Sequence, residues 1–73
     1  MVNKDEYRTK IILTAIKIFS RYGFKKTTMD EISKALKKGK SSIYYYYKSK
    51  EEIFEAVVLY EANQLRSQLT SAI

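Results

Sequence analysis

The sequence is most informative at residues 40–50, which read KSSIYYYYKSK. If this stretch is helical, Ile43 and Tyr47 lie one turn apart on one face, and their neighbours spread around the remaining circumference. Four successive tyrosines cannot all point inward from one helix, so at least two of them are exposed. An exposed tyrosine offers a rigid ring and a hydroxyl that can donate to a phosphate oxygen. The stretch therefore predicts a surface that contacts DNA, with Ile43 and Tyr47 facing the core.

Positive charge is concentrated in the same part of the chain. The 73 residues have a net charge of +6, from 14 lysines and arginines and 8 aspartates and glutamates. Residues 1–22 carry five basic and two acidic groups, residues 23–50 carry eight and two, and residues 51–73 carry one and four. The middle segment is therefore expected to attract a polyanion, which the acidic C-terminal segment would repel.

Length and composition exclude most enzymatic chemistry. A chain of 73 residues builds one small domain with a single core. It has no cysteine and no histidine, which removes disulfides, the usual zinc ligands and the commonest general base. Asp30 and Glu31 are adjacent, so on a helix they diverge and cannot form an acid and base pair. We expect no enzymatic activity, no metal and no cofactor.

The sequence predicts no membrane association through a spanning segment. No apolar run approaches the roughly 20 residues that cross a bilayer. The N-terminus also lacks the apolar segment of a signal peptide. We therefore expect a cytoplasmic protein.

Hydrophobic spacing predicts an all-α fold. The sequence has no proline and only two glycines, Gly23 and Gly39. Apolar residues otherwise recur at intervals of three and four residues, which is typical of helices with one buried face. The predicted helices cover about residues 7–22, 28–36, 40–46 and 50–70.

Capping motifs support the predicted helix ends. Thr28 with Glu31, and Ser49 with Glu52, have the spacing of capping boxes at the starts of the second and fourth helices. Gly23 stands where a left-handed residue is expected to close the first helix. The second and third helices are joined by a short turn, which is the helix-turn-helix arrangement.

The pattern resembles the DNA-binding domain of the TetR family of bacterial transcriptional repressors. The resemblance covers roughly residues 8–60 and rests on Gly23-Phe24, on residues 27–35 (TTMDEISKA) and on residues 40–51 (KSSIYYYYKSKE). It implies a three-helix, homeodomain-like helix-turn-helix domain, followed by the start of a fourth, connecting helix. Family members also carry a C-terminal domain that dimerises and binds a small-molecule inducer. We expect these 73 residues to lack that domain.

The resemblance also implies which residues contact DNA, with the helix 40–46 in the major groove. The expected base contacts are Lys40, Ser41, Ser42 and Tyr45. The expected phosphate contacts are Thr27 or Thr28, Tyr44, Tyr46 and Lys50, with Lys48 adding charge. Taken alone, Thr27 and Thr28 are more simply explained as helix caps. Lys50 opposes the dipole in the first turn of its helix, which favours a functional role.

The turn between the second and third helices departs from the family pattern. Lys37 and Lys38 replace the usual glycine and apolar residue, and the glycine follows at Gly39. Either Lys37 adopts a positive φ at a steric cost, or the turn shifts toward Gly39 and rotates the third helix. Lys38 would lay its methylene stem over the core. Tyr47 replaces the usual phenylalanine, so its hydroxyl needs a partner at the edge of the core.

Two functions of different classes follow from the sequence. The first is sequence-specific binding of double-stranded DNA, as the reading head of a transcriptional repressor that binds a palindromic operator as a dimer. The second is docking of a basic helical module on an anionic membrane or an acidic protein. Docking on a membrane predicts a continuous exposed apolar stripe beside the basic face, and the tyrosine-serine face is too polar for it. The isolated chain is expected to be monomeric or weakly associating.

Overall fold

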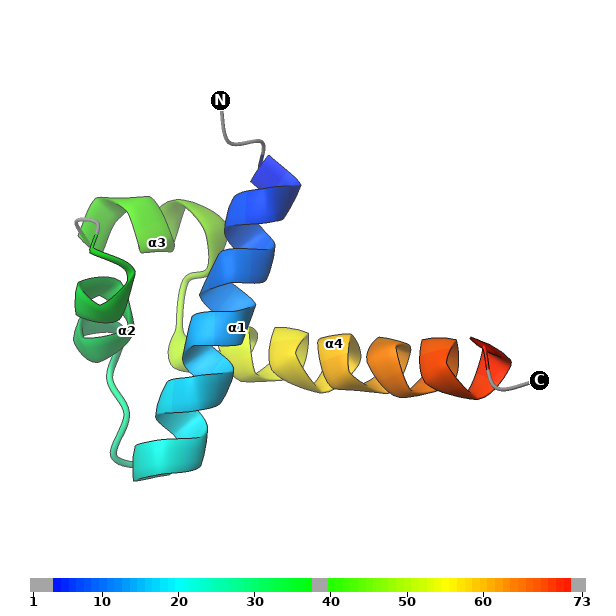
Figure 1. Ribbon diagram of the computed structural model, residues 1–73. Helices are drawn as coiled ribbons and strands as arrows, with labels where there is room; N and C mark the ends of the chain where they lie inside the picture. Colours follow the sequence, from blue (N-terminus) through cyan, green and yellow to red (C-terminus); the bar gives the residue numbers. More distant parts are fainter. Residues whose placement is uncertain (1–3, 38–39, 72–73) are drawn as a thin grey trace.

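The computed structural model describes residues 4–37 and 40–71, which form four helices (Figure 1). These are α1 (Lys4–Tyr22), α2 (Met29–Leu36), α3 (Lys40–Tyr46) and α4 (Lys50–Ser71). No strand occurs in the described ranges, so the all-α prediction is confirmed. Helix α1 begins three residues earlier than predicted. The prediction missed its first turn because that turn is polar and shows no apolar period. Asp5 and Glu6 in that turn complement the positive end of the helix dipole.

The helices meet around one core. Helices α2 and α3 lie on one side of α1, and α4 crosses α1 and extends away on the other side (Figure 1). The buried apolar side chains are Tyr7, Ile11, Ile12, Ala15, Ile32, Leu36, Ile43, Ile53 and Val57. Ile43 is 1% exposed, as the spacing of residues 40–47 predicted, and Tyr47 packs against the core without being fully buried. Each helix therefore contributes at least one buried side chain.

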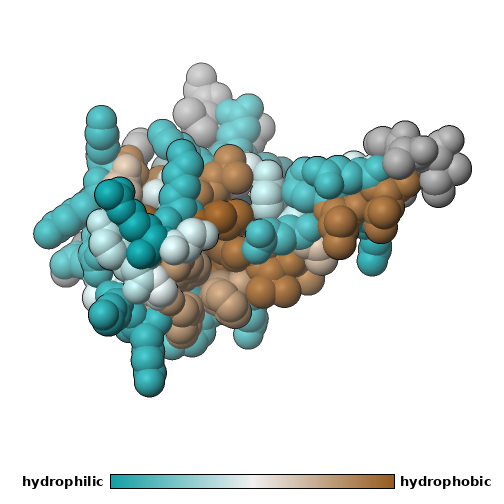
Figure 2. Space-filling view, turned by 60° about the horizontal axis from the view of Figure 1, so that its bottom comes forward, coloured by the Kyte–Doolittle hydropathy of each residue, from teal (hydrophilic) through white to brown (hydrophobic). Residues whose placement is uncertain are grey.

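The outer part of α4 leaves the core. Val58, Leu59, Leu65 and Leu69 are exposed along it. Figure 2 shows hydrophobic side chains continuing from the body of the molecule along the projecting helix. The first two turns of α4 are anchored in the core, by contrast, through Ile53 and Val57.

The turn between α1 and α2 is closed by local hydrogen bonds. Gly23 has φ 86°, and its N–H donates to the Phe19 carbonyl at 2.8 Å, as expected of a left-handed closing residue. The Phe24 ring then folds back to 5.4 Å from the Phe19 ring. Thr28 caps α2, where its hydroxyl accepts from the Glu31 N–H at 3.2 Å. These contacts fix the start of α2 relative to the end of α1.

Lys37 closes α2 in the left-handed conformation. Its φ is 60° and its ψ is 30°, and its N–H donates to the Lys34 and Ser33 carbonyls. The first of the two alternatives for this turn is therefore the observed one. The cost of the left-handed conformation for a residue with a Cβ is about 1–2 kcal/mol. Lys38 and Gly39, on which the other expectations for this turn rest, lie outside the described residues.

Candidate nucleic-acid interface

Helix α3 presents three tyrosines around its outward side. Residues advance by about 100° per position on an α-helix. Tyr45 therefore points nearly opposite to the buried Ile43, and it is 65% exposed. Tyr44 and Tyr46 flank it on either side, with Tyr44 40% exposed and Tyr46 half-buried. The helix thus has one outward face and two distinct edges.

The predicted base contacts fall partly within this face. Tyr45 is well exposed on it, whereas Ser42 is half-buried. The side chains of Lys40 and Ser41 lie outside the described residues. The contact of these four residues with bases stays a prediction.

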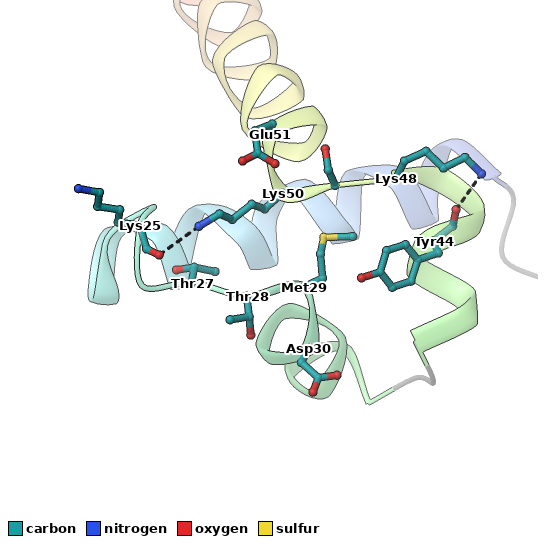
Figure 3. Close-up of a pocket in the computed structure, with 10 residues that line it drawn as sticks. Lys25, Thr27, Thr28, Met29, Asp30, Tyr44, Lys48, Lys50 and Glu51 are labelled. Carbon is teal, nitrogen blue, oxygen red and sulfur yellow. Dashed lines mark hydrogen bonds between the residues drawn. The ribbon is translucent and has the colours of Figure 1, made fainter.

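An open hollow of about 500 Å³ borders the Tyr44 edge of α3. We call it the α2–α4 hollow, because the first residues of those two helices line it together with Lys25, Tyr44 and Lys48. Figure 3 shows the Tyr44 ring directed into the hollow from α3, while the Asp30 carboxylate points away from it. The hollow therefore brings a hydroxyl and lysine side chains together from three separate parts of the chain.

Two helix N-termini meet at the α2–α4 hollow. Thr28 caps α2, and Ser49 accepts from the Glu52 N–H at 3.3 Å at the start of α4. The Glu52 carboxylate in turn accepts from the Lys48 N–H at 2.8 Å. Helix N-termini favour anions because their free N–H groups and the helix dipole both act on a negative group. Together with the nearby lysines, this arrangement suits a phosphate.

Lys50 connects the hollow to the turn between α1 and α2. Its ammonium donates to the Phe24 carbonyl at 2.7 Å and to the Lys25 carbonyl at 3.1 Å. It also lies 4.4 Å from the centre of the Phe24 ring, which is a cation–π contact. An ammonium has three N–H donors, so one donor remains for an anion. The predicted phosphate contact of Lys50 stays a prediction beside this structural role, which the sequence did not reveal.

Thr27 does not present its side chain to a partner. It borders the α2–α4 hollow but is only 1% exposed, and its hydroxyl donates to the Gly23 carbonyl at 2.7 Å. The burial of Thr27 argues against it as a phosphate contact, whereas Thr28 is exposed and its contact with a phosphate stays a prediction. The hydroxyl of Thr27 is used to close the turn.

Two further lysines border the hollow in different ways. Lys48 is exposed, and its ammonium donates to the Tyr44 carbonyl at 3.3 Å, at the C-terminal end of α3. This contact opposes the negative end of the α3 dipole. Lys25 is also exposed and lines the hollow, although no sequence pattern marked it as a site residue. Only the fold could reveal Lys25, because it brings residue 25 beside residue 50.

The other edge of α3 packs against the first turns of α1. The Tyr46 ring lies 5.0 Å from the Tyr7 ring and 5.1 Å from the Tyr45 ring. The Arg8 guanidinium lies 5.8 Å from the centre of the Tyr46 ring. Burial raises the pKa of Tyr47 and of Tyr7, and the positive charge of Arg8 partly opposes this increase in pKa at Tyr47. The Tyr46 ring therefore lies between Tyr7 of α1 and Tyr45 on the outward face of α3.

Comparison with known proteins identifies the family of this chain. Residues 11–57 match the model of a family described as bacterial regulatory proteins, tetR family. The chain belongs to the tetR family. The resemblance found from its motifs is thereby confirmed. The α2–α3 pair is the helix-turn-helix of this tetR-family domain, and the α2–α4 hollow and the outward tyrosines lie on that unit and on the start of α4.

Three curated relatives give the extent of the similarity. The biofilm operon icaADBC HTH-type negative transcriptional regulator IcaR of Staphylococcus epidermidis is 47% identical over 51 residues, which are 70% of this chain and 28% of that protein. The uncharacterized HTH-type transcriptional regulator YhgD of Bacillus subtilis is 36% identical over 67 residues, 90% of this chain and 35% of that protein. IcaR of Staphylococcus aureus is 43% identical over 51 residues, 70% of this chain and 27% of that protein. The matched part thus spans between 27% and 35% of each relative's length.

No solved structure matched this tetR-family chain significantly. Among the helices in residues 4–37 and 40–71, none combines the length and the apolar character that crossing a bilayer requires.

Proposed function

We propose that this tetR-family chain binds double-stranded DNA sequence-specifically, as the reading head of a transcriptional repressor. The observation that carries the proposal is the position of Tyr45 on the outward face of α3, beside a hollow where two helix N-termini and several lysines meet. A helix that enters the major groove needs donors to base edges on its outward face and phosphate ligands beside it. The chain has both features in one surface.

The phosphate ligands on the hollow side follow from the same geometry. A backbone phosphate in the α2–α4 hollow would accept from the Tyr44 hydroxyl. The Thr28 hydroxyl donates to the Glu31 carboxylate at 3.2 Å, so it would have to exchange that hydrogen bond for one to the phosphate. The remaining ammonium donor of Lys50 and the charge of Lys25 would add electrostatic attraction. Such contacts hold the register of the domain on DNA and leave base choice to α3.

The assignment as a repressor is supported by the relatives. IcaR of both staphylococcal species is named a negative transcriptional regulator. By analogy, the whole protein would bind a palindromic operator as a dimer, with one such domain on each half-site. A small-molecule inducer would act through a part of the protein outside these 73 residues.

The alternative, docking on an anionic membrane, is disfavoured by where the apolar side chains lie. Membrane docking needs an apolar stripe between basic flanks on one helix. Among the exposed apolar residues of α4, Phe54 lies beside the Phe24 ring that Lys50 contacts, whereas Val58, Leu59, Leu65 and Leu69 follow further along the helix and do not line the α2–α4 hollow. They also share α4 with four glutamates, which an anionic surface would repel.

An amide-resolved NMR titration tests the proposal. The chain is titrated at low salt with a mixed-sequence duplex, then with a duplex selected from a random pool, and vesicles of phosphatidylserine serve as the competing ligand. We expect shifts at residues 28, 42–46 and 48–50 with both duplexes, and tighter binding to the selected one. Shifts along residues 58–69 with vesicles, and none with DNA, would overturn the proposal.

A further inference from the structure

We propose that Arg8 of α1 binds a second DNA phosphate, on the edge of α3 opposite the α2–α4 hollow. This inference rests on the proposed function and extends it to a residue outside the helix-turn-helix. It concerns the edge of α3 that carries Tyr46, where the hollow provides no ligand. This second phosphate would lie between the Arg8 guanidinium of α1 and the tyrosines at this edge of α3.

We expect one phosphate site beside each edge of α3. A helix in the major groove lies between the sugar-phosphate backbones of both strands. Tyr44 and Tyr46 are two positions apart and therefore about 200° apart on the helix, one on each side of Tyr45. The Tyr44 edge has the hollow with its lysines. A positive group on the Tyr46 edge would serve a phosphate there in the same way, since the α3 side chains described at that edge are neutral tyrosines.

Among the side chains that the structure describes, Arg8 brings a positive charge to the Tyr46 edge. It is exposed, and its guanidinium lies 5.8 Å from the centre of the Tyr46 ring. A guanidinium stacked on an aromatic ring keeps its positive charge. The N–H donors at its edge stay available and can form a bidentate pair of hydrogen bonds with a phosphate. The Tyr46 ring that Arg8 contacts is itself packed against the Tyr7 and Tyr45 rings.

The Arg8 guanidinium can be reached by an external anion. Its side chain is exposed, and its contact with the face of the Tyr46 ring leaves the N–H donors at the guanidinium edge able to form hydrogen bonds. Lys10, two residues further along α1, is also exposed, but it points about 200° away from Arg8 on the helix. Lys10 offers a matched control, with the same charge and helix but a different face.

Salt-dependent binding of the 73-residue chain to a mixed-sequence 20-base-pair duplex tests the inference, with fluorescence anisotropy as the readout. We compare the wild type with Arg8→Gln, Arg8→Lys and Lys10→Gln. Loss of one phosphate contact lowers the slope of log K against log salt by about 0.9 and weakens binding about tenfold near 50 mM salt. We expect this loss for Arg8→Gln, most of the slope to be retained by Arg8→Lys, and little change for Lys10→Gln.

The possible results distinguish a failure of the inference about Arg8 from a failure of the proposed DNA binding. If the wild type does not bind the duplex, the proposed function fails. If the wild type binds and Arg8→Gln keeps the same slope, or if Lys10→Gln loses as much slope as Arg8→Gln, the inference about Arg8 fails and DNA binding stands. Should Arg8→Gln not fold, the side-chain Nε–H resonance of Arg8 in the wild type decides. It should shift on addition of the duplex, and a resonance that stays unmoved at saturation overturns the inference.

Discussion

Lys50 at the start of α4 donates a hydrogen bond of 2.7 Å to the carbonyl of Phe24, 26 residues earlier, and its ammonium lies 4.4 Å from the centre of the Phe24 ring. The Phe24 ring also contacts Phe54 of α4, at 5.1 Å between centroids, and Phe54 lies 5.9 Å from Phe19 of α1. One side chain thus holds a turn and a helix together next to the α2–α4 hollow. This contact gives Lys50 a structural role that can be tested separately from DNA binding.

Replacing Lys50 by methionine is expected to reduce the free energy of unfolding by about 1–2 kcal/mol, because two charge-assisted hydrogen bonds and a cation–π contact are lost. Urea unfolding monitored by circular dichroism measures the change. Lys26→Met is the control, because Lys26 is exposed beside the same turn, and surface substitutions usually stay within about 0.5 kcal/mol. Equal stability of the two variants would show that the contact with Phe24 contributes nothing.

Thr27→Val is expected to destabilise the fold by about 1–2 kcal/mol, since it removes the buried hydroxyl that donates to the Gly23 carbonyl. Thr9→Val removes a similar hydroxyl bond to the Asp5 carbonyl on the exposed side of α1, and it should change stability by less than about 0.5 kcal/mol. Thermal unfolding compares the two variants. Because Thr27 is buried, Thr27→Val should leave the salt slope of DNA binding unchanged, and a reduced slope would return Thr27 to the phosphate site.

Lys37→Gly is expected to stabilise the protein by about 0.5–1 kcal/mol. The substitution relieves a left-handed conformation that costs about 1–2 kcal/mol, while glycine loses more entropy on folding. Lys34→Gly, three residues earlier within α2, should instead destabilise by about 1 kcal/mol. Chemical denaturation of both variants measures these opposite signs. A destabilised Lys37→Gly variant would mean that the lysine side chain makes a contribution larger than the strain.

Tyr45→Ala is expected to change sequence preference, because Tyr45 is the most exposed tyrosine of α3, and to lower stability by about 0.5–1.5 kcal/mol through loss of its ring contact with Tyr46. Tyr44→Phe removes only a hydroxyl at the α2–α4 hollow, so it should weaken binding to all duplexes alike. Selection from a random pool followed by affinity measurements on several duplexes separates the two effects. Uniform weakening by Tyr45→Ala would place Tyr45 among the phosphate contacts.

Alkaline pH is expected to destabilise the fold through Tyr47. Burial raises the pKa of Tyr47 above its usual value of 10.0, so the folded state holds the phenolic proton more tightly than the unfolded chain does. The unfolded chain therefore binds fewer protons above pH 10, and stability falls as the pH rises through that range. Urea unfolding at pH 8 and pH 10.5 measures the fall. Tyr47→Phe should show a smaller fall than the wild type, and an equal fall would assign the effect to other groups such as Tyr7.

The sequence determined the four helices and most of their ends, though not the start of α1, because these depend on neighbours three or four residues apart. The period of apolar residues gave α1, the hydroxyl and carboxylate pairs at 28–31 and 49–52 gave the starts of α2 and α4, and Gly23 gave the end of α1. The burial of Ile43 against the exposure of Tyr45 followed from the same period. Backbone hydrogen bonds and caps of this kind are local, so the sequence order is sufficient to place them.

The tertiary structure decided which groups from distant parts of the chain meet. The sequence did not show that Lys50 would contact Phe24, that Arg8 would lie over Tyr46, or that the Thr27 hydroxyl would be used inside the turn. The sequence also left the conformation of Lys37 open. Its left-handed conformation costs about 1–2 kcal/mol, and the free energy gained by packing α2 and α3 can exceed that cost. Contacts between segments depend on how all the helices share one core, and no local pattern specifies that arrangement.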